Sequence, residues 1–155
     1  MASKITVSAP GKLILLGEHA VLYGEPCIVT TVDQRMAVTV RLRKEPNLEF
    51  QSKDVQVTGY KKPIKYLGTG SIPTGARFVE LAVRNFLQNY PITGGVSITT
   101  SSQFSSKFGF GSSSAVVVCT IKALSEITDT KLSNKQIFNL SYKTVLDVQG
   151  KGSGF

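Results

Sequence analysis

Apolar and polar residues alternate along much of the first third of the chain, and this pattern predicts a series of β-strands. Met36, Val38, Val40 and Leu42 occupy every second position, as in a half-buried strand. Shorter runs that alternate or are continuously apolar predict further strands at residues 4–7, 12–16, 26–32, 48–50 and 55–58. A break is expected at residues 9–11, where proline and glycine follow each other.

The second half of the chain is dominated by helical periodicity. Residues 59–75 are rich in Gly, Pro, Lys and Thr, which indicates a loop. A helix is then predicted over 76–90, with Thr74 as its cap and Pro91 at its end. The remaining predicted elements are a strand at 95–100 and helices at 113–127 and 133–149.

Ser133 and Gln136 form a capping-box pattern at the start of the last helix. Strands come first in this chain, and helices with one further strand follow. That order predicts an α+β fold, in which helices cover a mainly antiparallel sheet.

Two glycines and three consecutive serines, within residues 106–115, stand directly before the apolar run that begins at Val116. Glycine allows the backbone to approach a ligand closely, and the start of a helix offers free N–H groups and a positive dipole end. A serine could cap that helix. These features predict a phosphate cradle, and the alternative is a flexible Gly/Ser linker.

The composition is typical of a folded protein with one domain: of its 155 residues, 41% are hydrophobic and 18% are charged. No apolar run is long enough to cross a bilayer, and the N-terminus lacks a signal core, so we expect a cytoplasmic protein without membrane partners. Cys27 and Cys119 lie in apolar stretches and are predicted to be buried free thiols. A single histidine argues against a zinc site.

The net charge of +8 favours anionic partners, which include nucleic acid, acidic lipid and phosphorylated small molecules. The basic residues are spread along the chain and lack interleaved aromatic residues. This distribution argues against a nucleic-acid interface, although a basic nucleic-acid-binding module remains the alternative from a different functional class.

Three segments, in order, resemble the motifs of the superfamily of galacto-, homoserine, mevalonate and phosphomevalonate kinases (GHMP kinases). Residues 9–26, APGKLILLGEHAVLYGEP, closely resemble the first motif of mevalonate kinases. Residues 109–115, GFGSSSA, are similar to the superfamily's glycine loop, and residues 149–155, QGKGSGF, resemble the region before its catalytic aspartate. The resemblance covers nearly the whole chain and makes the phosphate cradle the preferred interpretation.

The resemblance implies a fold like the second domain of ribosomal protein S5. It also implies an activity, the Mg²⁺-dependent transfer of the γ-phosphoryl group of ATP to mevalonate in isoprenoid biosynthesis. By the same resemblance, Lys12 would lie near the acceptor oxygen, lower the pKa of the attacking hydroxyl and stabilise charge during transfer. Glu18 and His19 would contact the acceptor, and Ser153 would shape the turn before the catalytic base at the substrate site. The alternative for Ser153 is a disordered C-terminal tail.

The nucleotide-binding residues are also assigned through the resemblance. Ser113 would offer its hydroxyl to Mg²⁺ and the phosphates, and Ser102 matches a serine that contacts nucleotide in mevalonate kinases. The complete predicted set is Ser102, Lys107, Phe108, Gly109, Phe110, Gly111, Ser112 and Ser113. Ser112 and Ser114 have the alternative role of capping the helix, and Ser102 that of an ordinary strand-end serine.

The chain departs from the family in ways that limit the expected activity. The family's catalytic aspartate would be residue 156, and its magnesium-binding glutamate would be at Val145. Asp147 lies roughly 200° around a helix from that position, so it cannot take the role without a shift in register. We therefore expect residues 1–155 to be the N-terminal domain of such a kinase, without its C-terminal domain and inactive alone.

The acceptor of the phosphoryl group and the partner of the exposed apolar surface both remain open. Lys107 before the glycine loop and the final residues 150–155 look more like phosphomevalonate kinases, whereas the Glu18–His19 pair favours mevalonate as acceptor. Without its C-terminal domain, the chain would also expose apolar surface that could bind a separate polypeptide or drive self-association.

Overall fold

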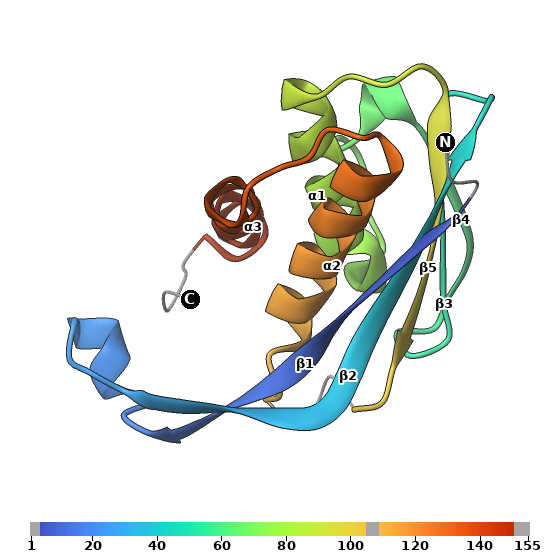
Figure 1. Cartoon of the computed structure of the whole chain (residues 1–155). Helices are drawn as coiled ribbons and strands as arrows, with labels where there is room; N and C mark the ends of the chain where they lie inside the picture. The colour runs from blue at the N-terminus through green and yellow to red at the C-terminus, as the bar shows by residue number, and fades with distance from the viewer. Residues whose placement is uncertain (1–3, 105–108, 151–155) are drawn as a thin grey trace.

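The computed structural model describes residues 4–104 and 109–150. Five strands form one sheet, and helices cover one of its faces (Figure 1). The strands are β1 (Ile5–Leu16), β2 (Ile28–Arg43), β3 (Asn47–Ser52), β4 (Val57–Pro63) and β5 (Gly95–Ser102). The helices are α1 (Arg77–Asn89), α2 (Ser112–Ile127) and α3 (Asn134–Gln149), with 3-10 turns η1 (Ala20–Tyr23), η2 (Ile64–Tyr66) and η3 (Thr74–Ala76).

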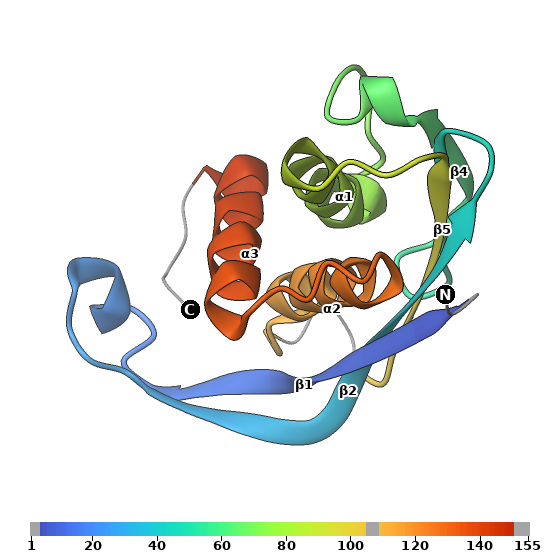
Figure 2. The same cartoon turned by 45° about the horizontal axis from the view of Figure 1, so that its top comes forward.

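The strand order is β1-β2-β5-β3-β4. Neighbouring strands are antiparallel except for the β3–β5 pair, which is parallel. This arrangement confirms the predicted α+β class with a mainly antiparallel sheet. Figure 2 shows all three long helices on the same side of the sheet.

The core lies between the sheet and the central helix α2, which packs on β1 and β2 and contacts both other helices. Val38 and Val40 are fully buried on β2, as their alternating positions predicted. From α2, Val117 and Ile121 meet them in the same core cluster. The β-branched residues of α2 therefore stay helical because burial of this face outweighs their modest helix propensity.

The predicted strand break at residues 9–11 is wrong, because β1 runs through it. A register shift between Pro10 and Lys12 absorbs the irregularity. β1 is an edge strand, where a missing N–H donor is tolerated. The separate strands predicted at 26–32 and 36–42 are likewise one continuous strand, β2.

Two other local predictions fail at the connection before α1. Part of the predicted loop 59–75 belongs to β4 and to the turns η2 and η3. Thr74 does not cap α1, because it begins η3, and the N-cap is Ala76 without a side-chain hydrogen bond. The capping box of Ser133 and Gln136 on α3 is confirmed by both reciprocal contacts.

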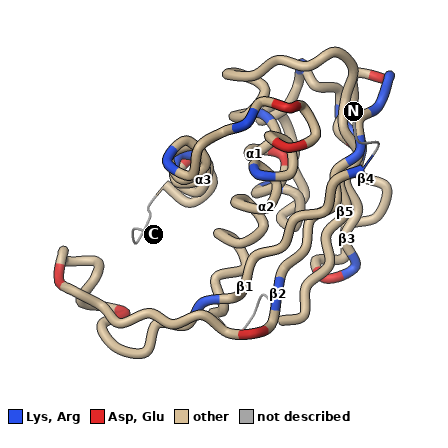
Figure 3. The backbone as a smooth tube through the Cα atoms, viewed as in Figure 1, with Lys and Arg blue, Asp and Glu red and all other residues tan. Residues whose placement is uncertain are grey.

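The ends of β1 and β2 project beyond the sheet as a two-stranded arm that carries η1 at its tip (Figures 1 and 3). Within β2, Met36–Arg43 pairs with β5, whereas residues 28–35 have β1 as their sole strand neighbour among the described residues. Large apolar side chains are exposed along the arm: Leu15, Leu16, Leu22, Tyr23, Ile28 and Val29. In the described part of the chain, no helix is long and apolar enough to cross a membrane.

Both cysteines are free thiols, as predicted. Cys119 is fully buried on α2, whereas Cys27 is only partly buried at the arm, which corrects the expectation that both are buried. Burial raises the pKa of the Cys119 thiol to about 11, although the charge of Arg35 and a backbone hydrogen bond at Ala9 act in the opposite direction.

Candidate functional site

The start of α2 lies against β1 through a short set of contacts. The backbone N–H of Lys12 donates to the carbonyl of Phe110 at 2.9 Å. Gly111 is the N-cap of α2 and adopts the left-handed region, with φ 70° and ψ 30°. A Cβ on Gly111 would stand only 2.7 Å from Cγ of Lys12, so the lysine side chain occupies the space that glycine leaves.

Glycine, and not serine, therefore caps the helix, which corrects the expected serine cap. Ser112, Ser113 and Ser114 form the first turn and are partly exposed. The N–H groups of a first helical turn lack intrahelical acceptors, and the positive end of the helix dipole lies there. This end of α2 can hold an anion beside the Lys12 side chain.

Aromatic packing fixes the glycine loop onto the sheet. The rings of Phe104 and Phe110 lie 5.8 Å apart between centroids and join Met36 and Ala115 in a small apolar cluster. Gly11 on β1 allows this approach, because a Cβ there would stand 3.1 Å from the Phe104 ring. The apolar ring of Phe110 thus positions the backbone and does not itself line the cavity described next.

A cavity of about 370 Å³ adjoins the start of α2. Ser112 and Ser113 lie on its wall, together with Ser102 from the end of β5. Its remaining lining residues are Met36, Phe50, Ser52, Asp54, Val55, Thr74, Gly75, Phe78, Val79, Thr100, Phe104 and Val116. Such a size, with mostly apolar walls and a few polar groups, is typical of a small-molecule site.

Ser102 has a local structural role inside this cavity. Its hydroxyl donates to the carbonyl of Phe104 at 2.6 Å and accepts from the Phe104 N–H at 3.2 Å. The backbone N–H of Ser102 donates to Oδ2 of Asp54 at 2.9 Å. These bonds tie the turn between β3 and β4 to the end of β5, just before the glycine loop.

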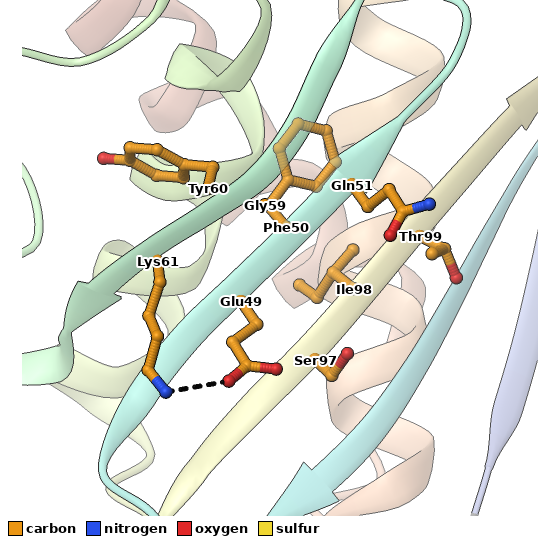
Figure 4. Close-up of a pocket in the computed structure, with 9 residues that line it drawn as sticks. All are labelled: Glu49, Phe50, Gln51, Gly59, Tyr60, Lys61, Ser97, Ile98 and Thr99. Atoms are coloured by element: carbon orange, nitrogen blue, oxygen red, sulfur yellow. Dashed lines mark ion pairs between the residues drawn. The ribbon is translucent and has the colours of Figure 1, made fainter.

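A second hollow of about 250 Å³ lies over β3, β4 and β5 (Figure 4). Two of its lining residues, Glu49 and Lys61, form an ion pair at 3.1 Å. Ser97 and Thr99 of β5 also line it. This hollow includes no residue of the glycine loop, so the cavity beside α2 is the better candidate site.

Glu18 and His19 are not brought to the cradle. Both are exposed at the end of the arm, where the carbonyl of His19 accepts from the N–H of Leu22 at 3.2 Å. Figure 1 shows η1 well separated from the start of α2. Their predicted contact with an acceptor stays a prediction. Lys107, Phe108 and Ser153 lie outside the described residues.

Asp147 is engaged elsewhere, between α1 and α3. Its Oδ2 accepts from Arg84 at 2.8 Å, Asn85 at 2.9 Å and Lys143 at 2.7 Å. Burial raises the pKa of this carboxyl, but the hydrogen bonds and the positive charges outweigh burial and hold the pKa below its usual value. Val145 is buried in the core, so neither residue serves the cradle.

Sequence reasoning missed Ser52 and Asp54. Ser52 closes β3, and Asp54 follows it in a polar turn that resembles any surface turn in the sequence. Only the pairing of β3 with β5 carries these residues to the wall of the cavity.

Comparison with known proteins places this site in context. The family model for the GHMP kinases N terminal domain matches residues 77–155. The mevalonate kinase of Pyrococcus abyssi is 34% identical over 99% of this chain, which spans 48% of that relative. The mevalonate kinase of Archaeoglobus fulgidus is 34% identical over 95% of the chain and 46% of the relative. The chain thus spans about half the length of the curated relatives that it matches.

Solved structures show the same fold. The Methanococcus jannaschii mevalonate kinase superposes with a TM-score of 0.86 at 27% identity, covering 97% of this chain and 48% of that one. A Lactococcus lactis galactokinase gives a TM-score of 0.83 at 19% identity, covering 97% and 39%, and shows likeness of fold alone. The sheet and helices are those of the expected domain, which is similar to the second domain of ribosomal protein S5.

Proposed function

This chain belongs to the GHMP kinase family, and from that premise we propose that it forms the nucleotide-binding half of an ATP-dependent kinase. The observation that carries the proposal is the left-handed Gly111 at the start of α2, packed against Lys12 beside a cavity of about 370 Å³. The curated relatives are named mevalonate kinases, which favours mevalonate as the acceptor of the phosphoryl group.

In this proposal the backbone of α2 binds the triphosphate. N–H groups of Ser112 and Ser113 donate to phosphate oxygens, and the helix dipole adds a favourable field. The Lys12 side chain packs against Gly111, and its ammonium balances negative charge on the phosphates and on the attacking oxygen. Apolar walls of the cavity contact the base of the nucleotide.

Magnesium would be held in large part by the phosphates. In the described ranges, no group of three or more His, Cys, Asp or Glu residues could hold a metal ion. Ser113, partly exposed in the first turn of α2, is the residue that we propose offers its hydroxyl to the ion. A bound Mg²⁺ would neutralise charge on the transferring phosphoryl group.

Glu18 and His19 are proposed to bind the acceptor from the arm. Both are exposed there, and apolar side chains such as Leu16 and Tyr23 flank them. An exposed apolar arm of this kind is typical of a surface that another domain covers. Because the relatives are about twice as long as this chain, we propose that the rest of such a kinase packs on the arm and supplies the catalytic base.

The proposal is tested first by nucleotide binding to the 155-residue chain. Isothermal titration calorimetry should detect ATP binding. The Lys12→Met substitution removes the ammonium charge but keeps an unbranched apolar side chain, and it should weaken ATP binding about tenfold. A chain that binds neither ATP nor inorganic tripolyphosphate would contradict the proposal.

The acceptor is tested by turnover. We expect the 155-residue chain alone to form no ADP, whereas a longer chain that includes a C-terminal half, as the relatives do, should form ADP when mevalonate is added. Phosphomevalonate serves as the competing acceptor. ADP formation with phosphomevalonate but not with mevalonate would overturn the assignment of mevalonate.

A further inference from the structure

Gln103 directly follows β5 and extends the pairing of β5 with β2 by one residue. The N–H of Gln103 donates to the carbonyl of Arg35 at 2.9 Å. In return, the Arg35 N–H donates to the side-chain oxygen Oε1 of Gln103 at 2.8 Å. The regular ladder ends one residue earlier, where Met36 lies opposite Ser102. A glutamine side chain therefore supplies the acceptor that a backbone carbonyl supplies inside the sheet.

Arg35 is itself held from the opposite side by β1. Its Nε donates to the hydroxyl of Ser8 at 2.9 Å, and its Nη2 donates to the carbonyl of Ser8 at 3.1 Å. At this residue β2 leaves β5 and continues into the arm with β1 as its described neighbour. Because Arg35 has bonds to both sides, it is a fixed support for the end of β5.

Further contacts lead from Gln103 to the phosphate cradle. Phe104, the next residue, is buried, and its ring packs on that of Phe110 with 5.8 Å between centroids. The carbonyl of Phe110 accepts from the N–H of Lys12 at 2.9 Å, and the next residue, Gly111, begins α2. The place of Phe104 thus determines where the helix starts relative to Lys12.

We infer that Gln103 is a positioning residue for the phosphate cradle. Its side-chain oxygen holds the end of β5 on Arg35, and the packed rings of Phe104 and Phe110 transmit this placement to the first turn of α2. Gln103 is exposed and does not line the cavity of about 370 Å³, so it acts through other residues. The inference rests on the proposed nucleotide-binding function. Helical N–H groups bind phosphate best when their direction is fixed before the ligand arrives.

The first test removes the acceptor and keeps the length of the side chain. Gln103→Met lacks Oε1, and calorimetry on the 155-residue chain should show about fivefold weaker binding of ATP. Inorganic tripolyphosphate should lose affinity by the same factor, because it uses the same cradle. The Ser102 N–H still donates to Asp54, so β5 stays in place and the melting temperature should fall by no more than about 3 °C.

The second test is rescue by a conservative variant. Gln103→Glu keeps an oxygen that accepts from the Arg35 N–H, and it should restore both affinities to within about twofold of the unsubstituted chain. The titrations are made at about 0.15 M salt, where the added charge is screened over about 8 Å. A residue that only filled space would be replaced as well by methionine as by glutamate.

Gln51→Met is the matched control. Gln51 is exposed on β3 and lines the hollow over β3, β4 and β5, which includes no residue of the glycine loop. The same substitution there should leave the affinities for ATP and tripolyphosphate unchanged.

The outcomes separate this inference from the proposed function. Unchanged binding in Gln103→Met overturns the positioning role and leaves the proposed function standing. A loss that Gln103→Glu does not restore, or a loss for ATP without one for tripolyphosphate, overturns it as well, because the bond to Arg35 or the cradle would not be the cause. Absence of binding of both ligands by the unsubstituted chain overturns the inference and the proposed function together.

Discussion

The side chain of Lys12 lies directly over Gly111, and a Cβ added to Gly111 would stand 2.7 Å from Cγ of Lys12. The two residues lie far apart in the sequence: Lys12 is in the edge strand β1, and Gly111 is the N-cap of the central helix α2. Their contact places a positive charge beside free helical N–H groups, which is the arrangement that an anion requires.

Replacement of Gly111 by Ala is expected to damage the cradle. Alanine would be strained at φ 70° and would also displace the lysine side chain. We expect a loss of more than about 2 kcal/mol in the free energy of unfolding and weaker ATP binding. Gly109 is the matched control, since it has the same φ of 70° but nothing within 4 Å of a Cβ. Urea denaturation should show a smaller loss for Gly109→Ala, and equal losses would refute the role of the Lys12 contact.

Glu80 is expected to be a major stabilising residue. Its carboxylate is fully buried on α1 and accepts from Lys62 at 2.8 Å, from the Gly68 N–H at 2.7 Å and from the hydroxyl of Tyr60. Burial, together with Glu80, raises the pKa of Tyr60 well above its usual value. Glu80→Ala leaves the Tyr60 hydroxyl and the charge of Lys62 without their carboxylate partner, although Lys62 still donates to the carbonyl of Thr69. The substitution should cost about 3 kcal/mol in urea denaturation.

The Glu80→Gln variant is the control for this network. Its amide oxygen still accepts a hydrogen bond, so its loss of stability should be smaller than that of alanine. A loss in Glu80→Ala no larger than about 0.5 kcal/mol would mean that the network contributes little.

Asp147 should make stability depend on acid pH. Its pKa in the folded chain lies below the unfolded value of about 3.9, so the unfolded chain binds more protons near that pH. The contribution of Asp147 is complete above the unfolded pKa and is lost as the pH falls through the folded pKa.

The Asp147→Asn variant should therefore lose about 1 kcal/mol at pH 7, after allowance for solvent screening, and less at pH 2. Chemical denaturation at both pH values measures the difference. Lys135→Met, which changes an exposed charge at the start of α3, is a control. Equal losses at pH 7 and pH 2 would contradict the assigned ionic role.

The two thiols should differ in reactivity. Cys119 is fully buried and its pKa is raised to about 11, so it holds almost no thiolate at pH 8. Cys27 is partly exposed on the arm. A disulfide reagent such as Ellman's reagent should label one thiol rapidly in the folded chain and two after denaturation, and Cys27→Ser should abolish the rapid phase. Rapid labelling of Cys119 would show that α2 opens readily.

The sequence by itself determined the class of fold, because alternating residues such as Val38 and Val40 could be buried only on one face of a strand. It also determined the capping box of Ser133, since that contact depends on residues three positions apart. The order of the motifs likewise indicated the kinase family, which the matching family model confirms.

Tertiary structure decided what depends on contacts between distant segments. It placed Pro10 in an edge strand, where a missing N–H donor is tolerated, and so joined two predicted strands into β1. It placed Lys12 over Gly111, and it brought Ser52 and Asp54 to the same cavity as Ser113. Local patterns could not reveal these contacts, because each requires the pairing of strands or helices that lie far apart in sequence.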